Sequence, residues 1–276
     1  MGYQKTLMKS VFYSGIGLHS GKDVNISFNP ALDDQGIVFS RTDLEGTPKV
    51  IAKVSNVVDT NRATTIGEGI AKVATVEHIL AALSALGIDN CNIELSSVEP
   101  PVMDGSSLPF ISLLKEAGIC QLKTLKKAPI VIEEALMVRD NDRFISVFPY
   151  EGFRITFTSV NNNPIIGIQF GDYEITEDTF VKELASARTI GFMHEIEALQ
   201  AQGLALGGSL ENALVYDNEK PLNNPRFEDE LVRHKILDVI GDLSLVGRRI
   251  KGHIVAVKSG HELNIMLARK ILEKFA

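Results

Sequence analysis

The stretch RHKILDVIGDL, residues 233–243, carries a histidine and two carboxylates at a regular spacing in an apolar segment. His234, Asp238 and Asp242 follow one another at intervals of four residues. On an α-helix such positions lie one above another with a drift of about 40° per step, so the three side chains can face one cleft. A histidine and a carboxylate one turn apart can bind a divalent metal together. Taken alone, this spacing is more typical of a solvated helix face than of a metal site, and a further ligand from another element is needed to favour the metal site.

A second helix that could contribute a ligand is predicted over VATVEHILAALSAL, residues 73–86, from the helical period of its apolar residues. Glu77 and His78 adjoin its apolar face. With His234 and Asp238, His78 would complete the two-histidine, one-carboxylate set of a catalytic zinc site that keeps a fourth position open to water. Glu77 is then a candidate base for that water. Iron(II) accepts the same ligands.

His261 follows the predicted strand GHIVAVKSG, residues 252–260, in a position that we expect to be a loop. A hydrogen bond donated by one ring nitrogen to the carboxylate of Asp242 would fix the tautomer and raise the pKa of His261, so that it could protonate a leaving group. The alternative is a loop histidine paired with a carboxylate for stability. His19, in the turn GIGLHSGK, could also line a site. That turn fails the phosphate-loop spacing G-x-x-x-x-G-K, so we expect no nucleoside triphosphate there.

Composition limits the class of protein. The chain has 276 residues, 45% of them hydrophobic and 23% charged, with a net charge of −7, which is typical of a globular protein and disfavours nucleic acid as a partner. Cys91 and Cys120 form no C-x-x-C pair, so neither a disulfide framework nor a thiolate zinc site is expected. No stretch has the length and apolarity of a signal peptide or a membrane span. We expect a cytoplasmic protein that acts as a monomer.

The order of predicted elements starts twice, on either side of the basic segment LKTLKKAP, residues 122–129. The segments EHILAALSALGIDNCNIEL and RHKILDVIGDLSLVGRRIKGHIVAV each run from a histidine through an aliphatic stripe to a glycine and a strand. Two similar α+β halves, residues 1–124 and 128–276, would bring the two histidines together across a pseudo-twofold axis. Further elements are expected in the second half: strands at 130–138, 144–149 and 153–160, helices around 190–202 and 227–246, and a short helix at the C-terminus.

Seven segments in order resemble a known family: GIGLHSG, TVEHILAAL, PVMDGSS, ARTIGF, GGSLENALV, RFEDELVRHKILDVIGDL and VKSGHELN. The chain is similar, from about residue 4 to its end, to the bacterial zinc-dependent UDP-3-O-acyl-N-acetylglucosamine deacetylases of lipid A biosynthesis. The resemblance implies an α+β fold of two similar α/β sandwich domains, packed helix against helix with the active site between them. It also implies hydrolysis of the substrate's N-acetyl group, with release of acetate.

The resemblance further assigns roles to residues. It implies zinc ligands at His78, His234 and Asp238, a base at Glu77, a proton donor at His261 with Asp242 as its partner, and an oxyanion contact at Thr189. Glu77 could itself supply the proton, with His261 as an electrostatic stabiliser.

An insert at about residues 184–215 would, by the same resemblance, form an apolar passage for the acyl chain. An amphipathic helix packing on its own domain would use the same residues. The expected lining is Ala185, Ile190, Phe192, Ile196 and Leu199. Lys235 and Lys258 are candidate contacts for the diphosphate or its sugar, although either could be an ordinary surface lysine, and His19 is a further candidate substrate contact. Many relatives are expected to have an aromatic residue where this chain has Ile190, so the preferred acyl length stays open.

Two functions from other classes compete with a hydrolase. A metal-free binding or scaffold module would use the polar helix line for structure and would bind no metal. A small-molecule kinase would bind a nucleotide, which the failed glycine spacing disfavours.

Overall fold

A five-stranded sheet forms within the first half of the chain in the computed structural model, which describes residues 2–275. The sheet is built on period-2 patterns: in β3 the side chains of Val24, Ile26 and Phe28 are buried and lie on one face, as the sequence predicts. The central pair, β9 and β4, is parallel, and the other pairs are antiparallel. The strand order is β2 (Val11–Ile16), β3 (Asp23–Asn29), β9 (Cys91–Leu95), β4 (Ile37–Arg41) and β5 (Lys49–Ile51).

Two smaller sheets complete this half. β1 (Tyr3–Leu7) pairs antiparallel with β10 (Ile119–Leu125), which joins the beginning of the half to its end. A short 3₁₀ turn, η1 (Val54–Asn56), leads into a three-stranded sheet. The strands of that sheet are β6 (Val57–Asp59), β7 (Thr65–Glu68) and β8 (Ala71–Val73).

A six-stranded sheet forms in the second half. Its central pair, β18 and β14, is parallel, whereas β13 and β15 pair antiparallel with β18 and β14 respectively. β11 (Ile130–Val131) adds a short parallel pairing with β18. The strand order is β12 (Leu136–Asp140), β13 (Arg143–Phe148), β18 (Ile250–Val257), β14 (Phe153–Val160) and β15 (Ile168–Glu174).

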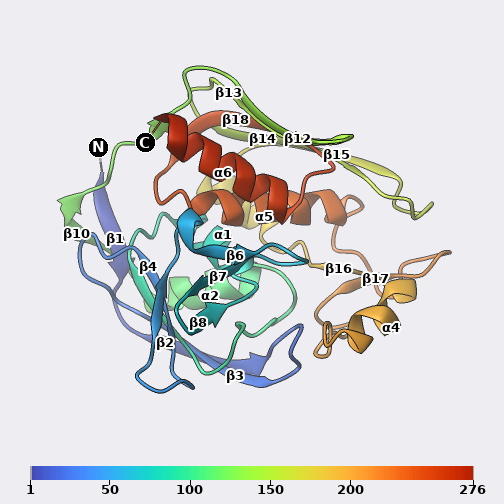
Figure 1. Ribbon diagram of the computed structural model, residues 1–276, viewed down its shortest axis with the longest axis horizontal. Helices are drawn as coiled ribbons and strands as arrows, with labels where there is room; N and C mark the ends of the chain where they lie inside the picture. The colour runs from blue at the N-terminus through green and yellow to red at the C-terminus, as the bar shows by residue number, and fades with distance from the viewer. Residues whose placement is uncertain (1, 276) are drawn as a thin grey trace.

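Four helices lie between the two large sheets (Figure 1). They are α1 (Glu77–Leu86), α2 (Leu108–Ala117), α5 (Glu230–Ser244) and α6 (His261–Phe275). α5 packs against β14 and β15, α6 packs against β12 and β13, and α1 packs directly against α5. Gly241 makes the close approach of α1 and α5 possible, because a Cβ there would lie 2.1 Å from the carbonyl oxygen of Glu77.

A separate group of small elements projects from the second half at the side of the molecule (Figure 1). It follows α3 (Glu177–Thr179) and the π-helical turn η2 (Phe180–Leu184). β16 (Ile190–Phe192) pairs in parallel with β17 (Leu214–Tyr216), and α4 (Met193–Ala201) lies between them in the chain.

Four sequence predictions need correction. The strand expected at 130–138 is two strands, because β11 pairs with β18 while β12 pairs with β13. The helix expected from residue 73 begins at Glu77, since Thr75 has a φ of 55°, which an α-helix cannot include. Residues 190–192 are extended because they pair with β17. The C-terminal helix is 15 residues long, and His261 is its first residue rather than part of a loop.

Candidate metal centre and active site

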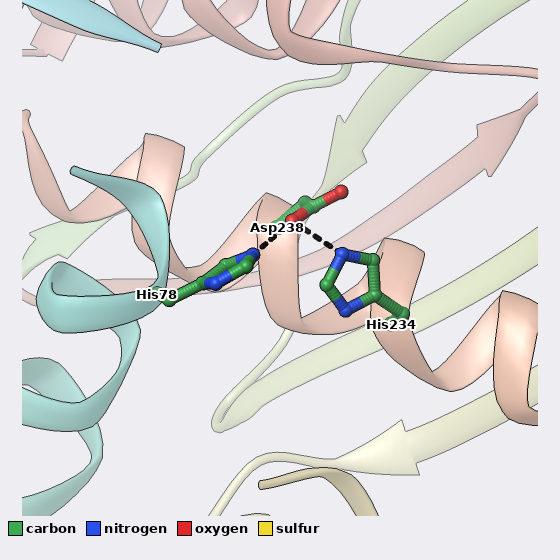
Figure 2. A group of neighbouring side chains, drawn as sticks. All are labelled: His78, His234 and Asp238. Carbon is green, nitrogen blue, oxygen red and sulfur yellow. Dashed lines mark ion pairs between the residues drawn. The ribbon is translucent and has the colours of Figure 1, made fainter. Parts of the chain in front are cut away.

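Three buried side chains converge where α1 packs against α5 (Figure 2). α1 supplies His78, and α5 supplies His234 and Asp238 from successive turns. One ligand atom from each residue lies within 4.8 Å of those of the other two. The Nε2 atoms of His78 and His234 lie 3.7 and 3.5 Å from Oδ1 of Asp238. The predicted set of metal ligands is therefore brought together from the two halves of the chain.

The chemistry of these donors fits a divalent cation. Among residues 2–275, no hydrogen-bond partner reaches Oδ1 of Asp238, although this atom is buried. Nδ1 of His234 lies 3.1 Å from the carbonyl oxygen of Ala187, and donation of its proton there leaves the Nε2 lone pair directed at the site. Burial lowers the pKa of His234 and lowers that of His78 to about 3, so both rings are neutral, as metal ligation requires.

Glu77 is buried beside these ligands at the start of α1. Its Oε2 accepts a hydrogen bond of 3.0 Å from the backbone N–H of Thr64. Burial raises the pKa of Glu77 to about 7, and the positive charge of His261 opposes that rise. A carboxyl group that titrates near neutral pH is suited to accept a proton from water.

His261 is held by Asp242, one turn beyond Asp238 on α5. Its Nδ1 lies 2.9 Å from Oδ2 of Asp242, and its Nε2 faces the metal centre at 4.0 Å from Oδ2 of Asp238. Burial opposes the charged imidazolium, but the charge and the hydrogen bond of Asp242 outweigh burial and raise the pKa of His261 to about 9. The histidine is therefore cationic at neutral pH and has a proton to donate.

A cavity of about 1300 Å³ opens from this centre. It is lined by most of the predicted substrate contacts and by the expected oxyanion residue: His19, Thr189, Ile190, Phe192, Lys235 and Lys258. Ile196 and Leu199 also line it. The prediction for Ala185 is wrong, because this side chain is fully buried in the hydrophobic core beside Leu184.

Comparison with known proteins agrees with this geometry. Residues 4–273 match the LpxC family, described as UDP-3-O-acyl N-acetylglycosamine deacetylase. The chain belongs to this family. It is 47% identical over 274 residues to the UDP-3-O-acyl-N-acetylglucosamine deacetylase of Syntrophotalea carbinolica, covering 99% of this chain and 88% of the relative.

Two further deacetylases are similar to this chain over almost its whole length. The deacetylase of Syntrophus aciditrophicus is 44% identical over 276 residues, which is 99% of this chain and 87% of the relative. That of Myxococcus xanthus is 46% identical over 271 residues, which is 98% of this chain and 86% of the relative. Within residues 2–275 of this deacetylase family member, no helix is both long and apolar enough to span a membrane.

The two predicted lysine contacts are ion-paired in the structure. Nζ of Lys235 donates to Oδ2 of Asp238 at 2.9 Å, and this pairing raises the pKa of Lys235 although burial opposes its charge. Burial likewise opposes the charge of Asp238, but the positive charges of Lys235 and His261 hold the pKa of that carboxyl below its usual range. Lys258 pairs with Asp142 at the cavity wall.

Two residues of the site were missed by sequence reasoning. Thr64 donates its backbone N–H to Glu77 and its hydroxyl to Oδ1 of Asp242 at 2.5 Å, so it links Glu77 to the partner of His261. Asn264 donates to Oδ2 of Asp242 at 2.8 Å. Recognising a helix that begins at His261 would have placed Asn264 one turn along the same face. No local signal marks Thr64.

Proposed function

We propose that this protein is a metal-dependent amide hydrolase that removes the N-acetyl group from UDP-3-O-acyl-N-acetylglucosamine and releases acetate, a step of lipid A biosynthesis. Membership of the deacetylase family over residues 4–273 gives the reaction class and the substrate. The observation that carries the mechanism is the buried convergence of His78, His234 and Asp238 with Glu77 and His261 around them.

Zinc is the proposed metal, held by the two imidazoles and the carboxylate, with iron(II) as the alternative that the same donors accept. When bound, a divalent cation acidifies water and polarises the acetamide carbonyl. The remaining chemistry belongs to side chains. Glu77 accepts one proton from the attacking water as the water oxygen adds to the acetamide carbon. Thr189 donates a hydrogen bond to the negative charge that develops on the carbonyl oxygen.

Breaking the C–N bond requires a proton on the departing nitrogen, because an amide anion is a very poor leaving group. His261, cationic and held by Asp242, supplies that proton, and the products are acetate and a free amine. A proton relayed by Glu77 itself is the alternative route, with His261 as the stabilising charge.

Two domains, residues 1–124 and 128–276, are proposed as an internal repeat with the active site between them. The pairing directions across the two large sheets support the repeat: each has a parallel central pair with antiparallel neighbours on both sides. The direct packing of α1 on α5 supports a site between the halves. We also propose a cytoplasmic monomer.

The substrate is proposed to occupy the cavity that opens from the metal centre. The acyl chain would follow the insert at about 184–215, along Ile190 and Phe192, and the UDP-sugar would contact Lys235, Lys258 and His19.

The test is the metal content and acetate release of protein purified without added zinc. We expect about one zinc per chain in the parent and loss of both zinc and activity in His234→Ala, with a fall in kcat/KM of roughly 10³-fold or more because several kcal/mol of transition-state stabilisation is lost. His253→Ala is the matched control, since His253 is a half-buried histidine on β18 that does not line the cavity and should keep the metal. Acetate release by metal-free parent would overturn the proposed mechanism.

A further inference from the structure

Each residue of the segment 186–189, which ends in Thr189, is fixed by a backbone hydrogen bond to a different group. The carbonyl oxygen of Ser186 accepts from Nη1 of Arg226 at 2.8 Å. The carbonyl oxygen of Ala187 faces Nδ1 of His234. The N–H of Arg188 donates to Oε1 of Glu230 at 2.9 Å, and the N–H of Thr189 donates to the carbonyl oxygen of Gly105 at 2.8 Å. The position of Thr189 is therefore set by groups outside its own segment.

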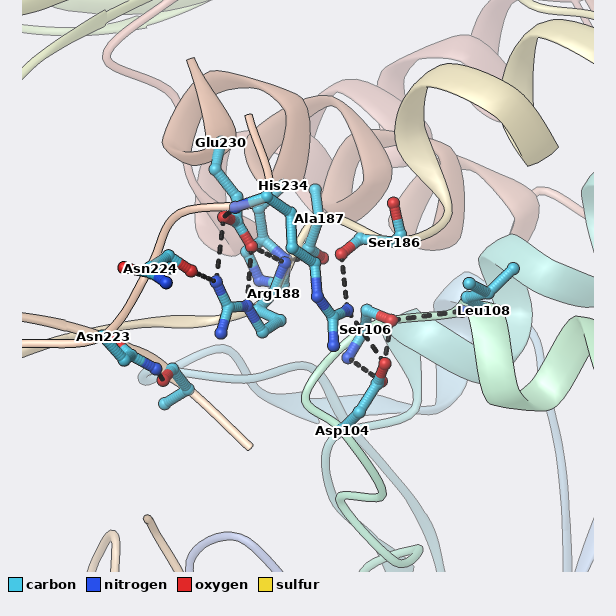
Figure 3. A network of polar contacts seen from close by, with 12 residues as sticks. Asp104, Ser106, Leu108, Ser186, Ala187, Arg188, Asn223, Asn224, Glu230 and His234 are labelled. Atoms are coloured by element: carbon cyan, nitrogen blue, oxygen red, sulfur yellow. Dashed lines mark hydrogen bonds and ion pairs between the residues drawn. The ribbon is translucent and has the colours of Figure 1, made fainter. Parts of the chain in front are cut away.

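Glu230 binds this segment through Arg188 (Figure 3). It is fully buried on α5, one turn before His234, and its carboxylate accepts from the guanidinium of Arg188 at 2.9 and 3.1 Å. The backbone N–H of Arg226 donates to the same carboxylate at 2.6 Å. One buried anion thus binds both the segment 186–189 and the backbone of Arg226.

Arg226 extends the network to the first half of the chain. Its Nη1 donates to Oδ2 of Asp104 at 2.8 Å as well as to Ser186. Oδ1 of Asp104 accepts from the N–H and the hydroxyl of Ser106 at 3.0 and 2.7 Å, which holds the loop around Gly105.

Gly105 connects this loop to Thr189 directly, because its carbonyl oxygen accepts the N–H of Thr189. It has a φ of 83°, and a Cβ there would lie 1.9 Å from the carbonyl oxygen of Asn212. Only glycine therefore allows the carbonyl oxygen of residue 105 to receive the N–H of Thr189 at this close approach.

We propose that Asp104, acting through Arg226, is a positioning residue that sets Thr189 against the reacting carbonyl group. This inference rests on the proposed function, because it requires Thr189 to contact the oxyanion. A loop of the first half would thereby control a group on the second half without touching substrate. Small misplacement of a group that stabilises the transition state is enough to slow the reaction by about 100-fold.

The test compares Asp104→Asn, Thr189→Ala and the double variant as zinc-loaded enzymes. Asp104→Asn keeps the acceptor for Ser106 but removes the charge that holds Arg226. We expect kcat to fall by about 10- to 100-fold at unchanged KM, since contacts made only in the transition state affect kcat alone. In the Thr189→Ala background, Asp104→Asn should lower kcat almost no further. Arg226→Lys, which keeps a cationic donor, should have a smaller loss of kcat than Arg226→Gln.

The matched control is Asp172→Asn, which removes an equally accessible carboxylate from a bidentate pair with Arg154; Asp172 is 27% exposed and Asp104 28%. It should leave kcat unchanged. An equal loss of kcat in the control, an unchanged kcat in Asp104→Asn, or a full additional loss in the double variant would overturn the positioning role. An inactive parent would instead overturn the proposed function itself.

Discussion

At the scale of single residues, two titratable groups of the site have raised pKa values for different reasons. Burial raises the pKa of Glu77 to about 7, and Asp242 raises the pKa of His261 to about 9 although burial opposes it. Between these values the carboxyl group is ionised and the imidazole is protonated. These protonation states agree with the proposed roles of Glu77 as base and His261 as acid.

The pH dependence of kcat/KM follows from this assignment. Activity should fall as pH drops through the pKa of Glu77, because the base becomes protonated, and should fall as pH rises through that of His261, because the acid loses its proton. A bound divalent cation lowers both pKa values. The acidic limb of the pH profile should therefore have its midpoint at or below about 7, and the basic limb at or below about 9.

Asp242→Asn tests whether His261 causes the basic limb of the pH profile. Removing this negative charge should lower the pKa of His261, so the basic limb should move down by about one unit or more while the acidic limb moves less. The measurement is kcat/KM of the zinc-loaded enzymes across pH, with zinc content determined in parallel. A basic limb that stays in place would assign it to another group.

At the scale of elements, the crossing of α1 and α5 is what joins His78 to His234. Gly241→Ala should force the helices apart, because its Cβ would lie 2.1 Å from the carbonyl oxygen of Glu77. We expect a destabilisation of about 1–3 kcal/mol, as for other overpacked sites, together with weaker zinc binding and lower activity.

The control for this prediction is Ile240→Val, a buried neighbour on α5 whose truncation should cost about 0.5–1.5 kcal/mol without moving α1. Thermal melts and zinc titrations of both variants separate the two effects. If Gly241→Ala bound zinc as tightly as Ile240→Val, the close approach of the helices would not be what sets the metal site.

The sequence predicts the parts of the site that lie within one element. The interval of four residues along α5 predicts that His234, Asp238 and Asp242 share a face, and the structure confirms it. Contacts between elements leave no such periodic signal. Thr64 meets Asp242 across 178 positions of the chain, and Arg226 meets Asp104 across 122.

Local backbone strain also escapes pattern reasoning. The apolar period of residues 73–86 fits one helix, yet the positive φ of Thr75 separates β8 from α1 and turns the chain just before Glu77. The extended form of residues 190–192 depends on β17, which lies more than 20 residues further along the chain.

At the scale of the whole molecule, the proposed metal ligands come from both halves of the chain. α1 and α5 each carry part of the set, so a bound cation would stabilise their packing in addition to its chemical role. Without a cation, Oδ1 of Asp238 has no hydrogen-bond partner among the described residues. The free energy of unfolding should therefore depend on metal.

Removing the metal with a chelator should lower the melting temperature of the parent. A ligand at about 1,000 times its dissociation constant adds about 4 kcal/mol to the free energy of unfolding, which corresponds to a shift of roughly 8–16 °C for a chain of this size. His234→Ala, which has lost a ligand, should have the same melting temperature with and without the chelator. Restoring zinc should raise the melting temperature of the parent only. Equal melting temperatures for the loaded and the stripped parent would mean that the ion does not hold the halves together, and activity would then depend on it for chemistry alone.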